Sequence, residues 1–173
     1  MNLLLELSNV SKSVPWMSLS HACASQSIQI ATAYDTLGED GVEHTLLQTN
    51  AAAMLVDPHL LKTATGPLRK SSVKYVIVNE DCIFAEGGEI EAFKEANPQF
   101  KVITYNELRK LGQENPVEPN PPKPEDTFAI MYTSGTGGTP KGVILSHASL
   151  IAAGKLLSFM GLFSADKVPH SCQ

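Results

Sequence analysis

The feature that most constrains the fold of this chain is an apolar run that breaks into a loop rich in glycine and hydroxyl side chains. Residues 128–132 are typical of a buried strand, and residues 133–142 follow as Thr-Ser-Gly-Thr-Gly-Gly-Thr-Pro-Lys-Gly. Glycines allow several backbone N–H groups to turn toward one point, the hydroxyl groups add donors, and Lys141 adds a mobile positive charge. The stretch therefore predicts a loop that binds phosphate groups.

Two familiar phosphate-binding loops are excluded by spacing. A Walker A loop ends in Gly-Lys-Ser/Thr, but here Pro140 precedes Lys141 and Gly142 follows it. A dinucleotide fingerprint requires a third glycine or alanine where Pro140 stands. The remaining alternative is a surface turn that contains glycines by chance. This is the weaker interpretation, because the pattern is long and directly follows a strand-like run.

Upstream of this loop, strand-like and helix-like stretches alternate. The expected strands are residues 28–33, 51–56, 73–78 and 101–105, with a returning strand at 143–145, and the expected helices are 16–27, 38–49, 58–68, 89–97, 106–111 and one from about 147. Asp57 and Asn106 are expected to cap two of these helices. Such alternation predicts an α/β fold with a mostly parallel sheet and right-handed crossovers.

A proline-rich segment divides the pattern. Residues 115–124 contain five prolines, which exclude a regular helix or central strand and predict an extended connector. The alternative is that this segment is a recognition ligand for a small adaptor domain. Residues 16–114 are then one α/β portion, and residues 125–160 are a strand-loop-strand-helix unit that carries the phosphate loop. Residues 1–15 and 161–173 receive no assignment.

Composition narrows the class of protein. The 173-residue chain is long enough for a real core, and its formal charge of −5 with scattered basic residues argues against a nucleic-acid partner. The cysteines Cys23, Cys82 and Cys172 are far apart, and neither they nor the histidines show metal-ligand spacing, so we expect no metal ligands and reduced cytoplasmic thiols. No apolar run is long enough to predict a transmembrane segment.

Residues 132–143 resemble the phosphate-binding signature of the adenylate-forming (AMP-binding) superfamily, Tyr-Thr-Ser-Gly-Ser/Thr-Thr-Gly-x-Pro-Lys-Gly-Val. One position departs, because Gly137 stands where the family usually has Ser or Thr. Residues 22–27 and 32–38 are also similar to the corresponding stretches of long-chain fatty-acyl-CoA synthetases of the fungal type. The resemblance covers about residues 16–160 and implies part of the large N-terminal domain of an adenylate-forming enzyme.

This resemblance implies a function and a site. Members activate a fatty acid with ATP and Mg²⁺ to an acyl-adenylate, and then transfer the acyl group to coenzyme A. Lys141 would act as a mobile clamp on the phosphates, and is the candidate catalytic residue. Tyr132 would support the loop from its strand, and His147 would begin a helix rather than act as a base. The implied phosphate-binding residues are Thr133, Ser134, Gly135, Thr136, Gly137, Gly138 and Lys141.

The resemblance also implies functional segments downstream of the loop that these 173 residues do not contain. They are a Gly-Tyr-Gly-x-Thr-Glu stretch that meets Mg²⁺, an aspartate for the ribose, a hinge, and a lysine of a small C-terminal domain. We therefore expect an incomplete ligase chain that is inactive alone, with a non-catalytic AMP-binding module or inert remnant as the alternative. Its partners would be small molecules. The resemblance also implies that the full-length protein associates peripherally with endoplasmic reticulum, peroxisome or lipid-droplet membranes.

Overall fold

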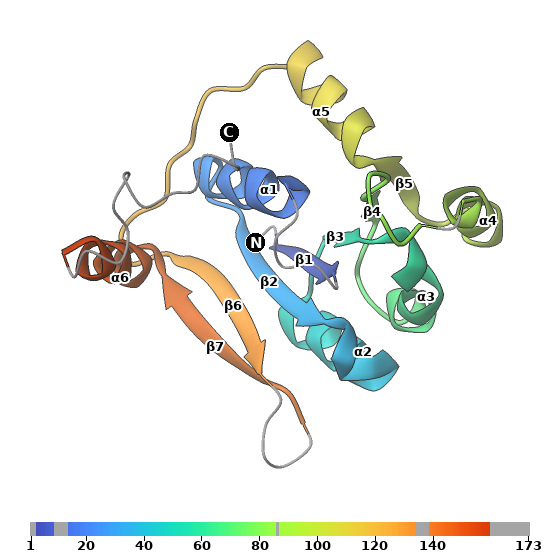
Figure 1. Cartoon of the computed structure of the whole chain (residues 1–173), viewed down its shortest axis with the longest axis horizontal. Helices are drawn as coiled ribbons and strands as arrows, with labels where there is room; N and C mark the ends of the chain where they lie inside the picture. Colours follow the sequence, from blue (N-terminus) through green and yellow to red (C-terminus); the bar gives the residue numbers. More distant parts are fainter. Residues whose placement is uncertain (1–2, 9–13, 86, 134–138, 160–173) are drawn as a thin grey trace.

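The computed structural model describes residues 3–8, 14–85, 87–133 and 139–159, which form one seven-stranded sheet with helices on both faces (Figure 1). The strands are β1 (Leu3–Ser8), β2 (Gln29–Tyr34), β3 (Ala53–Val56), β4 (Tyr75–Val78), β5 (Lys101–Thr104), β6 (Thr127–Thr133) and β7 (Lys141–Ser146). The helices are α1 (Val14–Ser25), α2 (Gly38–Thr49), α3 (Leu61–Arg69), α4 (Glu89–Ala96), α5 (Tyr105–Glu114) and α6 (His147–Phe159), with 3₁₀ turns η1 (Asp35–Leu37) and η2 (Pro58–Leu60).

The strand order is β5-β4-β3-β1-β2-β6-β7, and every neighbouring pair is parallel except β6 with β7. The predicted α/β fold with a mostly parallel sheet is therefore confirmed. The elements expected between residues 28 and 114 lie within a few residues of their predicted bounds, which is the usual uncertainty of helix and strand ends. Lys141 begins β7, two residues before the returning strand was expected.

Strand β1 is the main element that the sequence pattern missed, because residues 1–15 received no assignment. It lies between β2 and β3, with Leu4 opposite both Ile30 and Ala53 in the two parallel ladders. A short apolar run without alternation does not reveal by itself whether it is a strand. The partners on both sides of β1 place it near the middle of the sheet.

Two hydrophobic clusters lie on opposite faces of the sheet. One face is covered by α2, α3 and α4, whose buried members include Val42, Leu46, Ala64, Leu68 and Phe93. The other is covered by α1 and α5, which contribute Cys23, Leu19, Tyr105 and Leu108. Strands β2, β3 and β4 are mostly buried between these helices, as expected for parallel strands with helical crossovers, whereas β7 is largely exposed.

Asp57 is the N-cap residue of the turn η2 and is followed by Pro58, as predicted, but the Asp57 carboxylate makes no capping hydrogen bond. Its Oδ1 instead accepts a 2.9 Å hydrogen bond from Nδ2 of Asn79, the residue after β4. Asp57 bonds to Asn79 and not to the backbone of η2, because the Asp57 and Asn79 side chains are both buried where two adjacent strands end.

The predicted N-cap of α5 at Asn106 is wrong. Thr104 is the N-cap: its hydroxyl accepts a 3.1 Å hydrogen bond from the Glu107 backbone, and the Glu107 carboxylate accepts one of 2.8 Å from the Thr104 backbone. This capping box satisfies two backbone donors that would otherwise lack partners. The Glu80 carboxylate accepts two more, from the N–H groups of Tyr105 and Asn106.

The proline-rich connector is extended, as predicted, and carries the chain from α5 across to β6 (Figure 1). It is held against the end of α1, because the Asn120 N–H donates to the Ser25 carbonyl at 2.8 Å and the Ser27 hydroxyl donates to the Asn120 carbonyl at 2.7 Å. This path lets β6 pair with β2 on the far side of β1 from β5. The proposed division of the chain on either side of the connector stays a prediction.

Helix α6 presents apolar side chains to solvent. The apolar residues Leu150 and Ile151 predict part of a packing face for this helix, but both side chains are exposed, as is that of Leu156. Among the helices of the described residues, none is both long and apolar enough to cross a bilayer.

Candidate phosphate-binding site

The two ends of the predicted phosphate loop lie opposite each other on antiparallel strands. Thr133, the last residue of β6, pairs with Lys141, the first residue of β7, and the Thr133 hydroxyl donates to the Lys141 carbonyl at 3.5 Å. Both residues are exposed. The structure therefore brings together the first and last of the predicted phosphate-binding residues. The others, Ser134, Gly135, Thr136, Gly137 and Gly138, lie outside the described residues.

The loop begins at the carboxyl edge of the parallel strands. Strand β6 runs parallel to β2, so Thr133 ends its strand at the same edge at which Tyr34 ends β2 and Val56 ends β3. Ligands of open α/β sheets bind outside this edge, where backbone N–H groups and loop side chains converge. The position of the loop is thus appropriate for an anionic ligand.

Tyr132 anchors the strand that leads into the loop. Its side chain is buried, and its hydroxyl donates a 2.6 Å hydrogen bond to Oε1 of Gln48 on α2. Its ring also meets the ring of His44 edge to face, with centroids 6.4 Å apart. Burial raises the pKa of the Tyr132 hydroxyl, which keeps this group a neutral donor. Tyr132 is a strand residue, as predicted, and its support of the phosphate loop stays a prediction. No local sequence signal pointed to Gln48.

Gly142 allows the two loop-bearing strands to pack closely. A Cβ atom on Gly142 would lie 2.8 Å from Cγ2 of Ile130 and 3.2 Å from Cζ of Tyr132. The glycine of the Lys-Gly-Val motif is therefore required here by the space beside Tyr132. A Cβ atom on Gly41, in the first turn of α2, would lie 3.6 Å from Pro140, so the exit of the loop is next to that helix.

His147 begins α6, as predicted. Its backbone N–H donates to the Asp126 carbonyl at 3.1 Å, and its ring packs edge to face on Phe128 with centroids 5.2 Å apart. These contacts connect the end of β7 to the start of β6. They explain His147 as a structural residue.

A mostly parallel sheet of this kind, with a glycine-rich and hydroxyl-rich segment between two strands at its carboxyl edge, is the fold of part of the large domain of an adenylate-forming enzyme. Solved structures of that class superimpose on the chain. The A-PCP didomain of carboxylic acid reductase from Segniliparus rugosus, in complex with AMP, gives a TM-score of 0.76 at 19% identity, over 85% of this chain and 22% of that one. A long-chain-fatty-acid-CoA ligase from Archaeoglobus fulgidus gives 0.68 at 23% identity, over 92% and 28%.

The chain belongs to the AMP-binding enzyme family, whose model matches residues 10–169. Its relatives include the palmitoyl-CoA ligase FUM16 of Gibberella moniliformis, which is 49% identical over 140 residues, or 81% of this chain and 21% of the relative. Long-chain-fatty-acid–CoA ligase 1 of Schizosaccharomyces pombe is 44% identical over 138 residues, or 79% and 20%. The predicted kinship with fungal long-chain acyl-CoA synthetases is confirmed. The chain spans about a fifth of the length of these relatives.

Proposed function

We propose that this chain supplies the phosphate-binding part of a long-chain fatty acid–CoA ligase. That enzyme would activate a fatty acid with ATP and Mg²⁺ to an acyl-adenylate, and would then transfer the acyl group to coenzyme A. The observation that carries the proposal is the juxtaposition of Thr133 and Lys141 across the loop stem at the carboxyl edge of the sheet. The fungal relatives named as fatty acid–CoA ligases support the choice of substrate.

The chemistry explains why these side chains would be needed. In the first step a carboxylate oxygen of the fatty acid forms a bond to the α-phosphorus of ATP, and the bond from that phosphorus to pyrophosphate breaks. Negative charge then grows on the departing pyrophosphate, where the Lys141 ammonium and the Thr133 hydroxyl can stabilise it. Lys141 is the proposed catalytic residue in this sense, as a charged clamp and not as an acid or base. The backbone and hydroxyl groups of residues 134–138 complete the proposed cradle.

The surrounding contacts favour such a role. Tyr132 is held by Gln48, and the two strands meet closely at Gly142, so the backbone on each side of the loop is well supported. A side chain that follows the phosphates during the reaction must extend from a rigid backbone position. Lys141 fits this requirement, because its long side chain is exposed and its backbone belongs to strand β7.

The proposal extends to cofactors and location. Mg²⁺ would accompany the ATP phosphates, and we assign none of the described residues to it. We also propose a cytoplasmic protein that associates peripherally with endoplasmic reticulum, peroxisome or lipid-droplet membranes. One relative supports an organelle surface: long chain acyl-CoA synthetase 6 of Arabidopsis thaliana, 38% identical over 156 residues, is named as peroxisomal.

Calorimetric titration of the purified chain with ATP and with pyrophosphate, each with Mg²⁺, tests the site. We expect both ligands to bind, and Lys141→Ala to weaken each by about tenfold or more, since hydrogen bonds to charged groups contribute about 1.5–3 kcal/mol. Lys110→Ala is the matched control, because Lys110 is an exposed lysine on α5 whose ammonium lies 4.0 Å from Glu114. Equal binding by the wild type and Lys141→Ala, or no binding by a folded wild type, would contradict the proposal.

A second candidate is a module that binds nucleotide phosphates without forming acyl-CoA. It is favoured by the exposed loop stem, where Thr133 and Lys141 lie opposite each other on two strands and could hold phosphate groups without taking part in acyl transfer. Incubation of the 173-residue chain with ATP, Mg²⁺, palmitate and coenzyme A distinguishes the two candidates. Pyrophosphate binding without acyl-CoA supports the module, and acyl-CoA formation excludes it.

A further inference from the structure

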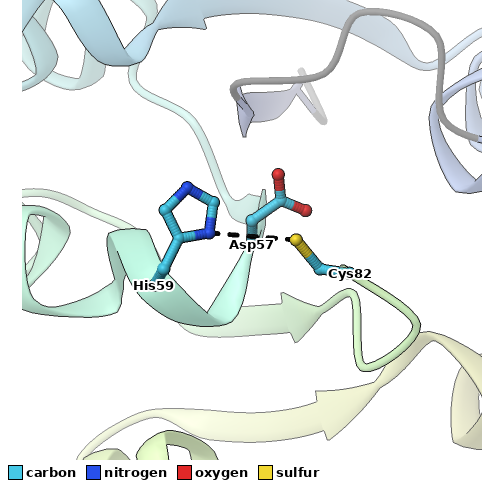
Figure 2. Close-up of side chains that lie close together, drawn as sticks. All are labelled: Asp57, His59 and Cys82. Atoms are coloured by element: carbon cyan, nitrogen blue, oxygen red, sulfur yellow. Dashed lines mark hydrogen bonds between the residues drawn. The ribbon is translucent and has the colours of Figure 1, made fainter. Parts of the chain in front are cut away.

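Three different metal-binding side chains converge at the carboxyl ends of β3 and β4 (Figure 2). Asp57 directly follows β3, His59 lies in the turn η2, and Cys82 lies in the turn after β4. One carboxylate oxygen, one imidazole nitrogen and the sulfur all lie within 4.8 Å of one another. The distance from Nδ1 of His59 to Sγ of Cys82 is 3.8 Å.

These separations are close to those of a tetrahedral zinc site. Zinc bonds of about 2.0–2.3 Å place neighbouring ligand atoms roughly 3.3–3.7 Å apart. The nitrogen and sulfur already lie near this spacing, and the carboxylate oxygen would need to move by up to about 1.5 Å.

The fold explains why the three residues meet. Val56 and Val78, the last residues of β3 and β4, lie opposite each other in the parallel ladder, so the residues that follow them emerge at the same edge. Asn79 then donates from Nδ2 to Oδ1 of Asp57 at 2.9 Å, and both side chains are buried. Such a partner orients a ligating carboxylate in established metal sites.

Two buried polar atoms beside the cluster lack partners. Nε2 of His59 and Oδ1 of Asn79 make no hydrogen bond within the part of the chain that the structure describes. Buried polar groups normally find a partner, because an unpaired one costs about 1–3 kcal/mol. An ion bound at Nδ1 of His59 leaves Nε2 on the far side of the ring, so it is the Asn79 oxygen that a water molecule on such an ion can pair with.

The charges beside the cluster favour a cation. The carboxylates of Asp57 and Glu89 both act electrostatically on the Cys82 side chain, so negative charge is concentrated at this edge of the sheet and attracts a positive ion.

We propose that Asp57, His59 and Cys82 bind a zinc-class divalent cation, with water in the fourth position. Mixed oxygen, nitrogen and sulfur donors select zinc over Mg²⁺ or Ca²⁺, which prefer oxygen ligands alone. His59 also lines an open cleft of about 460 Å³ between α3 and α4. The bound ion ties the turn after β3 to the turn after β4. Sequence spacing did not reveal the site because Cys82 lies 23 residues from His59.

Titration of the chain with Co²⁺, followed by competition with Zn²⁺, tests this site. We expect one ion per chain, a tetrahedral d–d spectrum and a thiolate-to-cobalt charge-transfer band. Zn²⁺ should displace the cobalt and remove both signals. A folded wild-type chain that binds no ion, or that shows a weak octahedral spectrum without the charge-transfer band, would overturn the proposal.

Matched variants assign the ligands. Cys82→Ser should abolish the charge-transfer band, and His59→Gln should weaken Zn²⁺ binding by at least about tenfold. Cys23→Ser and His21→Gln, both on α1, change the same residue types elsewhere and should leave the affinity within about twofold. Circular dichroism confirms that each variant is folded. An effect of Cys23→Ser equal to that of Cys82→Ser would overturn the assignment, and the wild-type cobalt spectrum decides the question if a ligand variant does not fold.

Discussion

The Tyr132 hydroxyl donates a 2.6 Å hydrogen bond to Oε1 of Gln48, a residue 84 positions earlier in the chain. This contact joins the strand that enters the phosphate loop to helix α2. Tyr132 lies directly before Thr133, the first residue of the predicted phosphate loop. The entrance to the loop therefore depends on packing against a distant helix.

Removing this hydroxyl should reduce stability. Tyr132→Phe leaves the Gln48 oxygen without its donor, and we expect the free energy of unfolding to fall by about 1 kcal/mol. Urea denaturation followed by circular dichroism measures the change. Tyr75→Phe is the control, because Tyr75 is exposed, and its effect should stay within about 0.5 kcal/mol. Equal losses from the two substitutions would show that the hydrogen bond to Gln48 does not stabilise the fold.

The close packing at Gly142 gives a second prediction. Gly142→Ala would place a methyl group 2.8 Å from Cγ2 of Ile130, so the two strands must separate, and we expect a loss of about 1–3 kcal/mol. Gly112→Ala on α5 is the matched control, since nothing lies within 4 Å of the added atom and alanine favours a helix. Thermal unfolding should show a lower Tm for the first variant only. Unchanged stability of Gly142→Ala would contradict the packing argument.

The cap of α5 gives a third prediction. Thr104→Ala removes one half of the capping box, and we expect it to cost about 1 kcal/mol in urea denaturation. Asn106→Ala removes the residue that the sequence pattern suggested as the cap, and should cost less than about 0.5 kcal/mol. The opposite order of the two effects would identify Asn106 as the functional cap.

Alkaline pH should destabilise the fold through Cys23. Burial raises the pKa of its thiol from 9.0 to about 11, so above pH 9 the unfolded chain loses this proton while the folded chain keeps it. The stabilising effect is complete below pH 9 and is lost as the pH rises through 11, with a total of about 2–3 kcal/mol. Unfolding free energies of the wild type and Cys23→Ala at several pH values measure the difference. Parallel pH profiles for the two proteins would show that Cys23 does not contribute.

Part of the site was visible in the sequence, because its pattern is local. The run Phe128–Val143 carries its strand, glycines, hydroxyl groups and lysine in one stretch, so the position of the loop after a strand could be predicted. The supporting contacts could not, because Gln48 and Gly41 belong to another part of the chain. The roles of the individual loop residues in binding phosphate stay predictions.

The sequence by itself determined the family, the alternation of strands and helices and the extended connector, and it predicted the phosphate loop, since each depends on residues that are neighbours in the chain. Only the tertiary structure decided that β1 lies between β2 and β3, that Asp57 contacts Asn79, and that Asp57, His59 and Cys82 meet. The reason is physical. Parallel strands bring together residues that are many positions apart in the chain, and buried polar side chains then form hydrogen bonds with these distant residues, which a local sequence pattern does not show.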